Sequence, residues 1–335
     1  MPGPTVVLAM VPALTEDLFD DDLLRELRAV ADVPDAEPLV TFTEPRAVAL
    51  LSGCDVLLTG WGCPPIDSAA LARAPRLRAI VHAAGTVKAH VTDACWDRGL
   101  MVTSAAAANA LPVAEYTLAA ILFANKKLFR LQQLYREVRS FRWWPAEAPG
   151  LGNYRKTIGL VGASMVGRRV LELLRPFDFD VVVSDPYLSA EEAASLGVRA
   201  VELDELLRVA DVVSLHAPAL PETHHLLDAR RLRLLRDGAT LINTARGWLV
   251  DGDALLEELR HGRIDAVIDT TDPEIPPEDS PLYDLPNVFL TPHVAGAMGK
   301  ETRRLGALAV EEIGRFARGE PLRFAIRREQ LAQLA

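Results

Sequence analysis

Short apolar runs alternate with helical patterns over the first part of the chain. In the helical patterns, apolar side chains recur at every third or fourth position and so form one apolar face. One such pattern covers residues 17–33. Strands that alternate with helices predict a parallel sheet with helices on both of its faces. The apolar runs that we interpret as strands are 6–10, 39–42, 56–59, 79–82 and 101–103.

A longer helical pattern then covers residues 111–139. The loop after it contains Pro149 and Gly150 and marks a domain boundary. A second series of strands starts at Thr157, and a last helical pattern covers 301–318. Because the first sheet lacks a closing helix of its own, we expect this last helix to return to it. The later strands are predicted at 181–183, 212–215, 241–242, 266–268 and 288–290.

Composition narrows the class of protein. The chain has 335 residues, which is enough for two domains of ordinary size. Its net charge of −10 argues against non-specific binding to nucleic acid, which needs a basic face. The three cysteines have no paired spacing, so a reducing, cytoplasmic setting fits better than a disulfide framework. No cluster of cysteine and histidine has the spacing of zinc ligands, so we expect no metal.

The most apolar window of the sequence covers residues 105–124. It contains Asn109, Pro112 and Glu115, which would be costly in the hydrocarbon core of a bilayer. We therefore expect a buried helix between the domains and no membrane partner.

The stretch from Thr157 to Asp185 has the pattern of a dinucleotide-binding unit. A strand leads into a turn with Gly162, Ser164 and Gly167, and an apolar helix leads to a second strand that ends at Asp185. Glycine lets the backbone approach a pyrophosphate, the helix N-terminus supplies N–H donors, and the acid accepts hydrogen bonds from ribose hydroxyls. The acid also predicts NAD rather than NADP, because it repels a 2′-phosphate. Ser164 replaces the usual middle glycine, and the sequence leaves open whether it caps the helix, contacts phosphate or does both.

Polar residues follow each predicted strand of the second series. The carboxyl ends of parallel strands meet at one edge of a sheet, and ligands bind outside that edge. Chance would scatter polar groups over both edges of the sheet. Their convergence on one edge is therefore stronger evidence for a ligand site than any single motif. The groups concerned are Asp185, His216, the segment 243–247, Asp269 with Glu274, and His293.

Three of these residues form a chemical set. Arg246 can bind a carboxylate through two charge-assisted hydrogen bonds and stays charged at working pH. His293 can exchange a proton with a hydroxyl or carbonyl oxygen near neutral pH. Glu274 would favour the imidazolium form of His293 and fix its tautomer. This set suits hydride transfer between a nicotinamide and a 2-hydroxy or 2-keto acid.

Three segments resemble the signature segments of the D-isomer-specific 2-hydroxyacid dehydrogenases. They are Leu241–Asp251 (LINTARGWLVD), Asp269–Glu274 (DTTDPE) and Thr291–Gly296 (TPHVAG). The resemblance spans nearly the whole chain. It implies an α/β fold with two doubly wound parallel-sheet domains, in which a Rossmann NAD domain is inserted into a flavodoxin-like substrate domain. It also implies a homodimer built through the NAD domain.

In this resemblance, residues 1–108 would begin the substrate-binding domain and 109–299 would form the NAD-binding domain. Residues 300–335 would form the C-terminal helix that returns to the substrate domain. The resemblance gives substrate orientation to Arg246, acid/base catalysis to His293 paired with Glu274, and substrate contacts to Gly85, Thr86 and Asn109. The cofactor contacts that it implies are Gly162, Ser164, Met165, Val166, Asp185, His216, Ala217, Pro218, Thr223, Thr244, Ala245, Asp269 and Gly296.

Several positions depart from the family pattern: Ser164, Thr270, Ile275 and the pair Val87 and Lys88. The leading hypothesis is an NAD(H)-dependent 2-hydroxyacid dehydrogenase that acts as a 2-ketoacid reductase. One alternative is an NADH-sensing binding protein like the corepressor relatives of the family, and another is a phosphite-type dehydrogenase. Glu274 argues against formate oxidation, because formate enzymes of this fold typically have an amide at that position.

Overall fold

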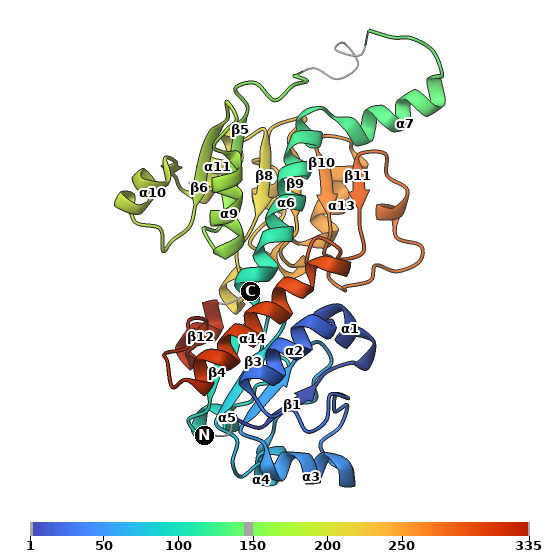
Figure 1. Cartoon of the computed structure of the whole chain (residues 1–335). Coiled ribbons are helices and arrows are strands. Elements are labelled where there is room, and N and C mark those ends of the chain that lie inside the picture. The colour runs from blue at the N-terminus through green and yellow to red at the C-terminus, as the bar shows by residue number, and fades with distance from the viewer. Residues whose placement is uncertain (1–2, 144–149, 334–335) are drawn as a thin grey trace. The chain divides into compact units, whose positions relative to one another are not determined.

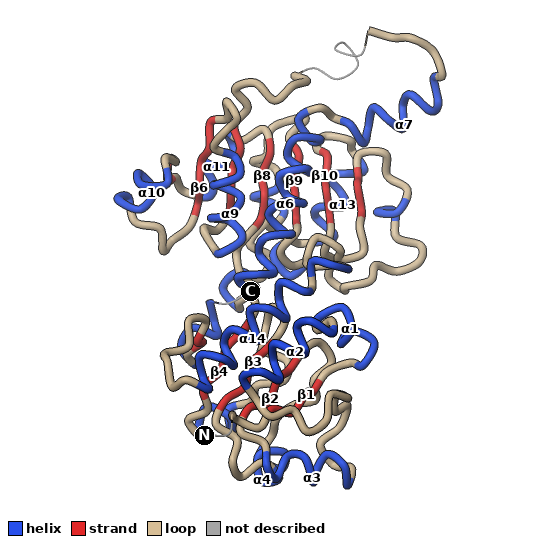
Figure 2. Tube along the Cα trace, viewed as in Figure 1, coloured by secondary structure: helices blue, strands red, loops and turns tan. Residues whose placement is uncertain are grey.

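The computed structural model describes residues 3–143 and 150–333. Helices flank two sheets, so the predicted α/β class is confirmed (Figure 2). Pro149 of the predicted boundary loop lies outside the described residues.

The chain divides into two compact units. Unit 1 combines the residues up to Asn109 with those from Ala297 onward, and unit 2 is Ala110–Gly296. The sequence placed these boundaries after residues 108 and 299. Asn109 and Ala297, which both lie in unit 1, are bonded to each other, since the N–H of Ala297 donates to Asn109 Oδ1 at 3.0 Å.

The sheet of unit 1 has the strand order β1-β2-β3-β4-β12. Its first four strands are parallel, whereas β12 runs antiparallel to β4. β12 was not predicted, because a strand of two residues leaves no periodic signal. The bounds are Val6–Ala9 for β1, Val56–Thr59 for β2, Ala79–His82 for β3, Met101–Ser104 for β4 and Ala325–Ile326 for β12.

The predicted strand at 39–42 is wrong. Only one isolated parallel bridge forms there, between Leu39 and Ala9. The chain turns here instead of extending, because the Thr41 hydroxyl oxygen accepts a hydrogen bond from Thr43 N–H at 3.3 Å. The bridge still occupies the position next to β1, and the resulting order is that of flavodoxin-like sheets.

Helices cover both faces of this sheet (Figure 1). Alternate strand residues enter separate cores, because side chains on a strand point to opposite faces. One core contains Leu23, Leu27 and Ile313, and the other contains Leu51 and Leu71. The first core holds helices α1 (Thr15–Leu18), α2 (Asp21–Val30) and α14 (Arg303–Ala317), and the second holds α3 (Pro45–Gly53), α4 (Ser68–Arg73) and α5 (Asp93–Asp97).

The helix predicted at 17–33 is two helices. Phe19 leaves the helical conformation after α1, and Asp20 then begins α2 as its N-cap. Asp20 Oδ1 accepts a hydrogen bond from Leu23 N–H at 2.8 Å. This cap separates the two helices, because the N-cap residue has an extended backbone.

The sheet of unit 2 is parallel throughout, with the order β11-β10-β9-β8-β5-β6-β7. The chain begins in the middle at β5, builds one half outward to β7, and then returns to build the other half from β8. This is the Rossmann arrangement, and its switch point lies between β5 and β8. The bounds are Thr157–Val161 (β5), Asp180–Ser184 (β6), Arg199–Ala200 (β7), Val212–Leu215 (β8), Thr240–Asn243 (β9), Asp265–Ile268 (β10) and Val288–Leu290 (β11).

Two cores fill the faces of this sheet. One contains Ile121 and Val170 with Leu160, and the other contains Leu206 and Leu255 with Leu241. The first core is covered by helices α6 (Ala106–Asn125) and α9 (Met165–Leu174), and the second by α11 (Leu203–Val209), α12 (Ala229–Leu232) and α13 (Gly252–Arg260), while α10 (Ala190–Leu196) contacts β7.

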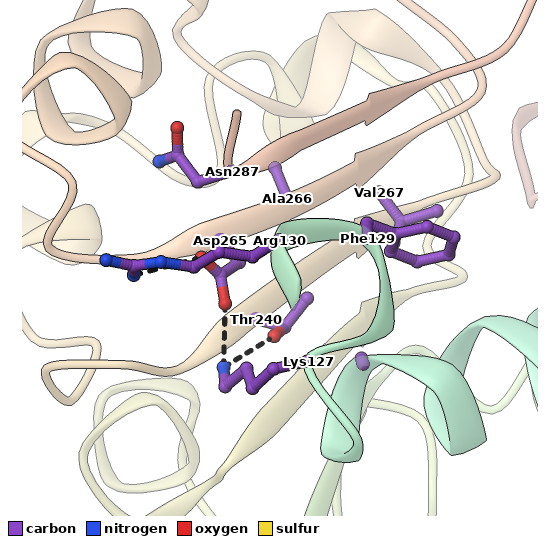
Figure 3. A pocket seen from close by; sticks show the side chains of 9 residues that line it. Lys127, Phe129, Arg130, Thr240, Asp265, Ala266, Val267 and Asn287 are labelled. Atoms are coloured by element: carbon purple, nitrogen blue, oxygen red, sulfur yellow. Dashed lines mark hydrogen bonds and ion pairs between the residues drawn. The ribbon is translucent and has the colours of Figure 1, made fainter. Parts of the chain in front are cut away.

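The helix predicted at 111–139 is also two helices, α6 and α7 (Leu128–Val138). Lys127 between them adopts a left-handed conformation with φ of 51°. Its ammonium group donates to Asp265 Oδ2 at 2.8 Å and to Thr240 Oγ1 at 3.3 Å (Figure 3). These bonds tie the break between the helices to the first residues of β9 and β10.

Helix α6 is long and apolar enough to pass a length-and-composition test for a membrane span. A core helix of a soluble protein passes the same test. Ala114 and Ile121 are fully buried in the core of unit 2 against β5. This packing accounts for the apolar character of the buried face of α6.

Candidate active site

The turn after β5 requires glycine at two positions. Gly162 has φ of +99°, and a Cβ atom there would lie 2.7 Å from the backbone nitrogen of Ala217. A Cβ atom on Gly167 would lie 2.2 Å from the carbonyl oxygen of Gly162. Both contacts involve backbone atoms, which cannot rotate away. The two glycines therefore bring β5, the N-terminus of α9 and the loop after β8 together.

Ser164 is the N-cap of α9. Its Oγ accepts a hydrogen bond from Gly167 N–H at 3.4 Å, and its backbone is extended at φ −65° and ψ −179°. Any residue can adopt this conformation, so the turn does not need glycine here. Met165 and Val166 follow in the first turn, and Met165 is exposed.

We expect Ser164→Gly to tighten NADH binding about threefold, because it removes a side chain that would crowd the pyrophosphate, while the lost cap costs only a few tenths of a kcal/mol. Titration calorimetry would measure the change in the dissociation constant. Ser164→Ala is the matched control, since it also removes the hydroxyl but keeps a Cβ atom. Unchanged or weaker NADH binding in Ser164→Gly would mean that the hydroxyl is tolerated or is itself a ligand.

Asp185 follows β6 and faces the glycine turn. Its Oδ2 accepts a hydrogen bond from Ala163 N–H at 2.6 Å, and its Oδ1 accepts one from Tyr187 N–H at 2.8 Å. Each carboxylate oxygen has two lone pairs, so both oxygens can still accept from ribose hydroxyls. These two hydrogen bonds fix the Asp185 carboxylate beside the turn.

The loop after β8 offers backbone rather than the His216 side chain. His216 is buried, its Nε2 lies 3.0 Å from Ser214 Oγ, and burial lowers the pKa of its imidazole to about 3. The ring is therefore neutral at working pH and has a structural partner. Beyond Ala217, the hydroxyl of Thr223 donates to the carbonyl of Pro218 at 2.7 Å and closes the loop.

Asn243 ends β9 and shapes the loop that follows. Its Nδ2 donates to the carbonyl of Arg246 at 2.9 Å, and its Oδ1 accepts from Ala245 N–H at 3.1 Å. The buried hydroxyl of Thr244 lies 3.1 Å from Thr117 Oγ1 on α6. These bonds hold the loop after β9 in its observed conformation.

The guanidinium group of Arg246 is half-buried, and its Nη1 donates to the carbonyl of Ala245 at 2.7 Å. Burial lowers the pKa of Arg246, and the nearby negative charge of Glu274 opposes that change. Arginine remains charged in proteins, because its ordinary pKa lies far above working pH. Arg246 therefore supplies a fixed positive charge near Glu274.

Gly247 lets the loop after β9 touch the loop after β10. A Cβ atom on Gly247 would lie 2.0 Å from the carbonyl carbon of Thr271 and 2.3 Å from the nitrogen of Asp272. No side chain fits between the two backbones. The contact brings Arg246 beside the segment that carries Glu274.

Asp269 follows β10 and organises the loop that carries the histidine. Its Oδ1 accepts from Thr291 Oγ1 at 2.6 Å and from Val294 N–H at 2.9 Å, and its Oδ2 accepts from Ala295 N–H at 3.0 Å. Thr291 Oγ1 also lies 2.8 Å from the hydroxyl of Tyr116 on α6. Oδ1 has two partners and Oδ2 has one, so Oδ2 can still accept a hydrogen bond, and a contact with the nicotinamide carboxamide stays a prediction.

His293 and Glu274 form a hydrogen-bonded pair, with 2.5 Å between His293 Nδ1 and Glu274 Oε1. Thr271 Oγ1 donates to the Glu274 carbonyl at 2.9 Å and fixes that turn. The backbone of His293 is left-handed, with φ of 55°, a conformation that residues other than glycine adopt uncommonly. Such strain persists only where the surrounding structure imposes it, which is common at functional sites. The side chain is 44% exposed, so its other nitrogen, Nε2, can reach a ligand.

The predicted substrate residues lie together in unit 1. A Cβ atom on Gly85 would lie 3.7 Å from Asn109 Nδ2, and Asn109 Oδ1 accepts the hydrogen bond from Ala297. Thr86 Oγ1 accepts a hydrogen bond from Lys88 N–H at 3.4 Å. Gly296, the last residue of unit 2, is half-buried.

Sequence reasoning missed the residues that hold these loops. Tyr116 and Thr117 bond residues that are distant in sequence, and nothing in the local pattern marks them. Thr291 lies in a predicted signature segment, but its bond to Asp269 was not predicted. Asn243 gave a usable signal, because asparagine at a strand end commonly bonds the backbone two residues on. In the parts of the chain that the structure covers, no group of three or more His, Cys, Asp or Glu side chains is placed to hold a metal ion.

A family model described as "D-isomer specific 2-hydroxyacid dehydrogenase, NAD binding domain" matches residues 118–295. The chain is 30% identical over 312 residues to D-3-phosphoglycerate dehydrogenase of Methanocaldococcus jannaschii, covering 93% of this chain and 58% of that protein. It is 32% identical over 270 residues to glyoxylate reductase of Korarchaeum cryptofilum, covering 80% of this chain and 81% of that protein.

Among solved structures, a protein from Thermus thermophilus matches with a TM-score of 0.75 and 31% identity, over 96% of this chain and 100% of that one. The chain spans about half the length of several curated relatives that it matches, such as 49% of the Archaeoglobus fulgidus D-3-phosphoglycerate dehydrogenase. The similarity extends over both units, since the matches cover nearly the whole of this chain.

Proposed function

Because the chain belongs to the D-isomer-specific 2-hydroxyacid dehydrogenase family, we propose that it transfers a hydride between NAD(H) and a D-2-hydroxy acid or 2-keto acid. The observation that carries this proposal is the pair of His293 and Glu274 at 2.5 Å, on loops that Gly247 places beside Arg246. The cytoplasmic location and the homodimer through the NAD domain belong to the same proposal.

The residues of unit 2 fit a dinucleotide. Gly162 and Gly167 let the turn after β5 pack closely against its neighbouring backbone, and the free N–H groups at the N-terminus of α9 would bind the pyrophosphate. Asp185 stands where ribose hydroxyls would bind, and its charge favours NAD over NADP. When bound, the nicotinamide would supply or accept the hydride.

The protein's own residues would handle binding and the proton. In the direction of reduction, His293 Nε2 would donate a proton to the substrate oxygen, and Glu274 would stabilise the charged ring through Nδ1. Arg246 would hold the substrate carboxylate or carbonyl through its guanidinium fork. Gly85, Thr86 and Asn109 of unit 1 are proposed to bind the substrate carboxylate by backbone N–H groups and an amide.

The purified protein should oxidise NADH with at least one 2-ketoacid from a panel of glyoxylate, hydroxypyruvate, pyruvate and phenylpyruvate. The catalytic efficiency with NADPH should be lower, because Asp185 repels the 2′-phosphate. Stopped-flow absorbance of NADH would measure both. If no acid in the panel is turned over, the proposed activity is wrong. Equal catalytic efficiency with NADPH and NADH would contradict the proposed role of Asp185.

A further inference from the structure

Three buried polar side chains of unit 1 come from the strand ends and the segment next to the Gly85–Thr86 loop. Thr59 ends β2, His82 ends β3, and His90 follows the loop. Thr59 Oγ1 lies 2.9 Å from His82 Nδ1 and 3.3 Å from His90 Nε2. The two imidazole rings are 4.4 Å apart between centroids. The three side chains therefore form one connected chain, which the catalytic roles above leave unused.

Both histidines are neutral. His82 and His90 are each only 3% exposed, and Thr59 is fully buried. Burial lowers the pKa of His82 to about 3, with a further contribution from His90, and burial lowers the pKa of His90 to about 4. A hydrogen bond between His82 and the Thr86 backbone acts in the opposite direction on His82.

Neutral rings restrict where the protons lie. A neutral imidazole has one N–H and one acceptor nitrogen, and a hydroxyl has a single hydrogen. If Thr59 donates to His82 Nδ1, then Thr59 must accept from His90 Nε2–H, and His82 carries its own proton on Nε2. That nitrogen is then the donor for the Thr86 carbonyl. One proton arrangement thus satisfies every group, from His90 through Thr59 and His82 to Thr86.

The far end of the chain is held as well. His90 N–H donates to the Val87 carbonyl at 3.2 Å, and the His90 carbonyl accepts from Ile66 N–H at 2.8 Å. The loop is therefore anchored at Thr86 by a side chain from β3 and at residues 87–90 by its own turn. A donor to the Thr86 carbonyl orients the peptide plane on the C-terminal side of Thr86 and limits rotation of the peptides next to it.

We infer that His82, supported by Thr59 and His90, is a positioning residue that holds the Gly85–Thr86 loop so that its N–H groups face the substrate carboxylate. This inference rests on the proposed function, because it needs the loop to bind a carboxylate. The chain acts through the loop and touches neither the substrate nor the cofactor. Its loss should therefore weaken ketoacid binding and leave the chemistry unchanged.

Two substitutions of His82 separate positioning from packing. His82→Gln places an amide N–H near the position of Nε2 and keeps the donor to Thr86, whereas His82→Asn reaches only as far as Nδ1 and loses that donor. We expect His82→Asn to raise the KM for the best ketoacid about tenfold, the effect of one lost hydrogen bond, with kcat and the dissociation constant of NADH unchanged. His82→Gln should restore most of the KM.

Thr59→Val tests the chain with a milder change, in case the histidine variants do not fold. It should also raise the KM for the ketoacid, because it leaves the acceptor nitrogen of His82, Nδ1, without a hydrogen-bond donor. Thr103→Val is the matched control, since Thr103 is equally buried in the same sheet and its hydroxyl has no partner among the described residues. It should leave the KM unchanged.

Amide hydrogen exchange gives a readout that is independent of turnover. Exchange at residues 85–88 should be faster in His82→Asn than in His82→Gln or the wild-type protein. Equal KM and exchange in the two His82 variants would overturn the inference and leave the proposed function intact. An inactive wild-type protein would overturn both, whereas normal wild-type turnover with slow loop exchange in every variant would overturn the inference alone.

Discussion

His293→Asn is expected to lower kcat for ketoacid reduction by about 10²- to 10⁴-fold, the usual contribution of a positioned general acid. The reason lies in the pair that His293 forms with Glu274, which orients the ring and leaves Nε2 for the substrate oxygen. Asparagine is the right replacement, because it tolerates the left-handed backbone at φ of 55° better than alanine does. NADH binding should stay nearly unchanged. Steady-state kinetics and fluorescence titration of NADH would measure the two quantities.

The chain offers a matched control for this variant. His225 also has a left-handed backbone, with φ of 49°, and it is exposed in the same unit. Its ring stacks on His224 with 3.8 Å between centroids and is not part of the proposed machinery. His225→Asn should therefore keep the wild-type rate. If both variants lose activity to the same degree, the backbone conformation matters rather than the imidazole, and the assignment of His293 as the acid fails.

Much of the fold follows from local pattern. The strands predicted at 56–59, 79–82, 212–215 and 288–290 are confirmed at both ends. The first three are buried runs rich in apolar residues, as is typical of parallel sheets, and the fourth is the partly exposed edge strand β11. The single helices predicted at 17–33 and at 111–139 are each divided into two helices in the structure. In both places a single polar residue that forms side-chain hydrogen bonds marks the break between two helices.

These two breaks differ in how visible they are. Asp20 caps α2 through a neighbour three residues away, so a capping rule could have found it. Lys127 is fixed by Asp265 and Thr240, which are more than a hundred residues away in sequence. No local rule contains that information. Long-range polar contacts are therefore the part of the fold that pattern reasoning does not reach.

The candidate site shows the same division. Residues at strand ends were predicted because the geometry of a parallel sheet brings all carboxyl ends to one edge. The structure places Glu274 against His293 as the sequence suggested, but their catalytic roles remain predictions. The supports of the site come from elsewhere, since Tyr116 on α6 reaches Thr291 only after α6 has packed on the sheet. The sequence therefore pointed to the candidate catalytic residues, but not to the long-range contacts that hold them in place.

Gly247→Ala is expected to remove most activity and to destabilise the protein. The added Cβ atom would meet the Thr271 backbone at 2.0 Å, so the loops after β9 and β10 must separate. A displacement of about 1 Å at a reacting group can cost about 10²-fold in rate, and overpacking costs about 1–3 kcal/mol of stability. We therefore expect kcat/KM to fall about 10²-fold and the free energy of unfolding to fall by about 2 kcal/mol.

Gly252→Ala is the matched control, because a Cβ atom at that position has no neighbour within 4 Å. Gly252 is the first residue of α13, where alanine is favourable, so stability should be equal or slightly higher. Urea denaturation and steady-state kinetics on both variants separate the effects. Full activity in Gly247→Ala would show that Arg246 does not need its contact with the Glu274 segment. Loss of stability with unchanged kcat/KM would confine Gly247 to folding, and the contact between the two loops would then carry no catalytic role.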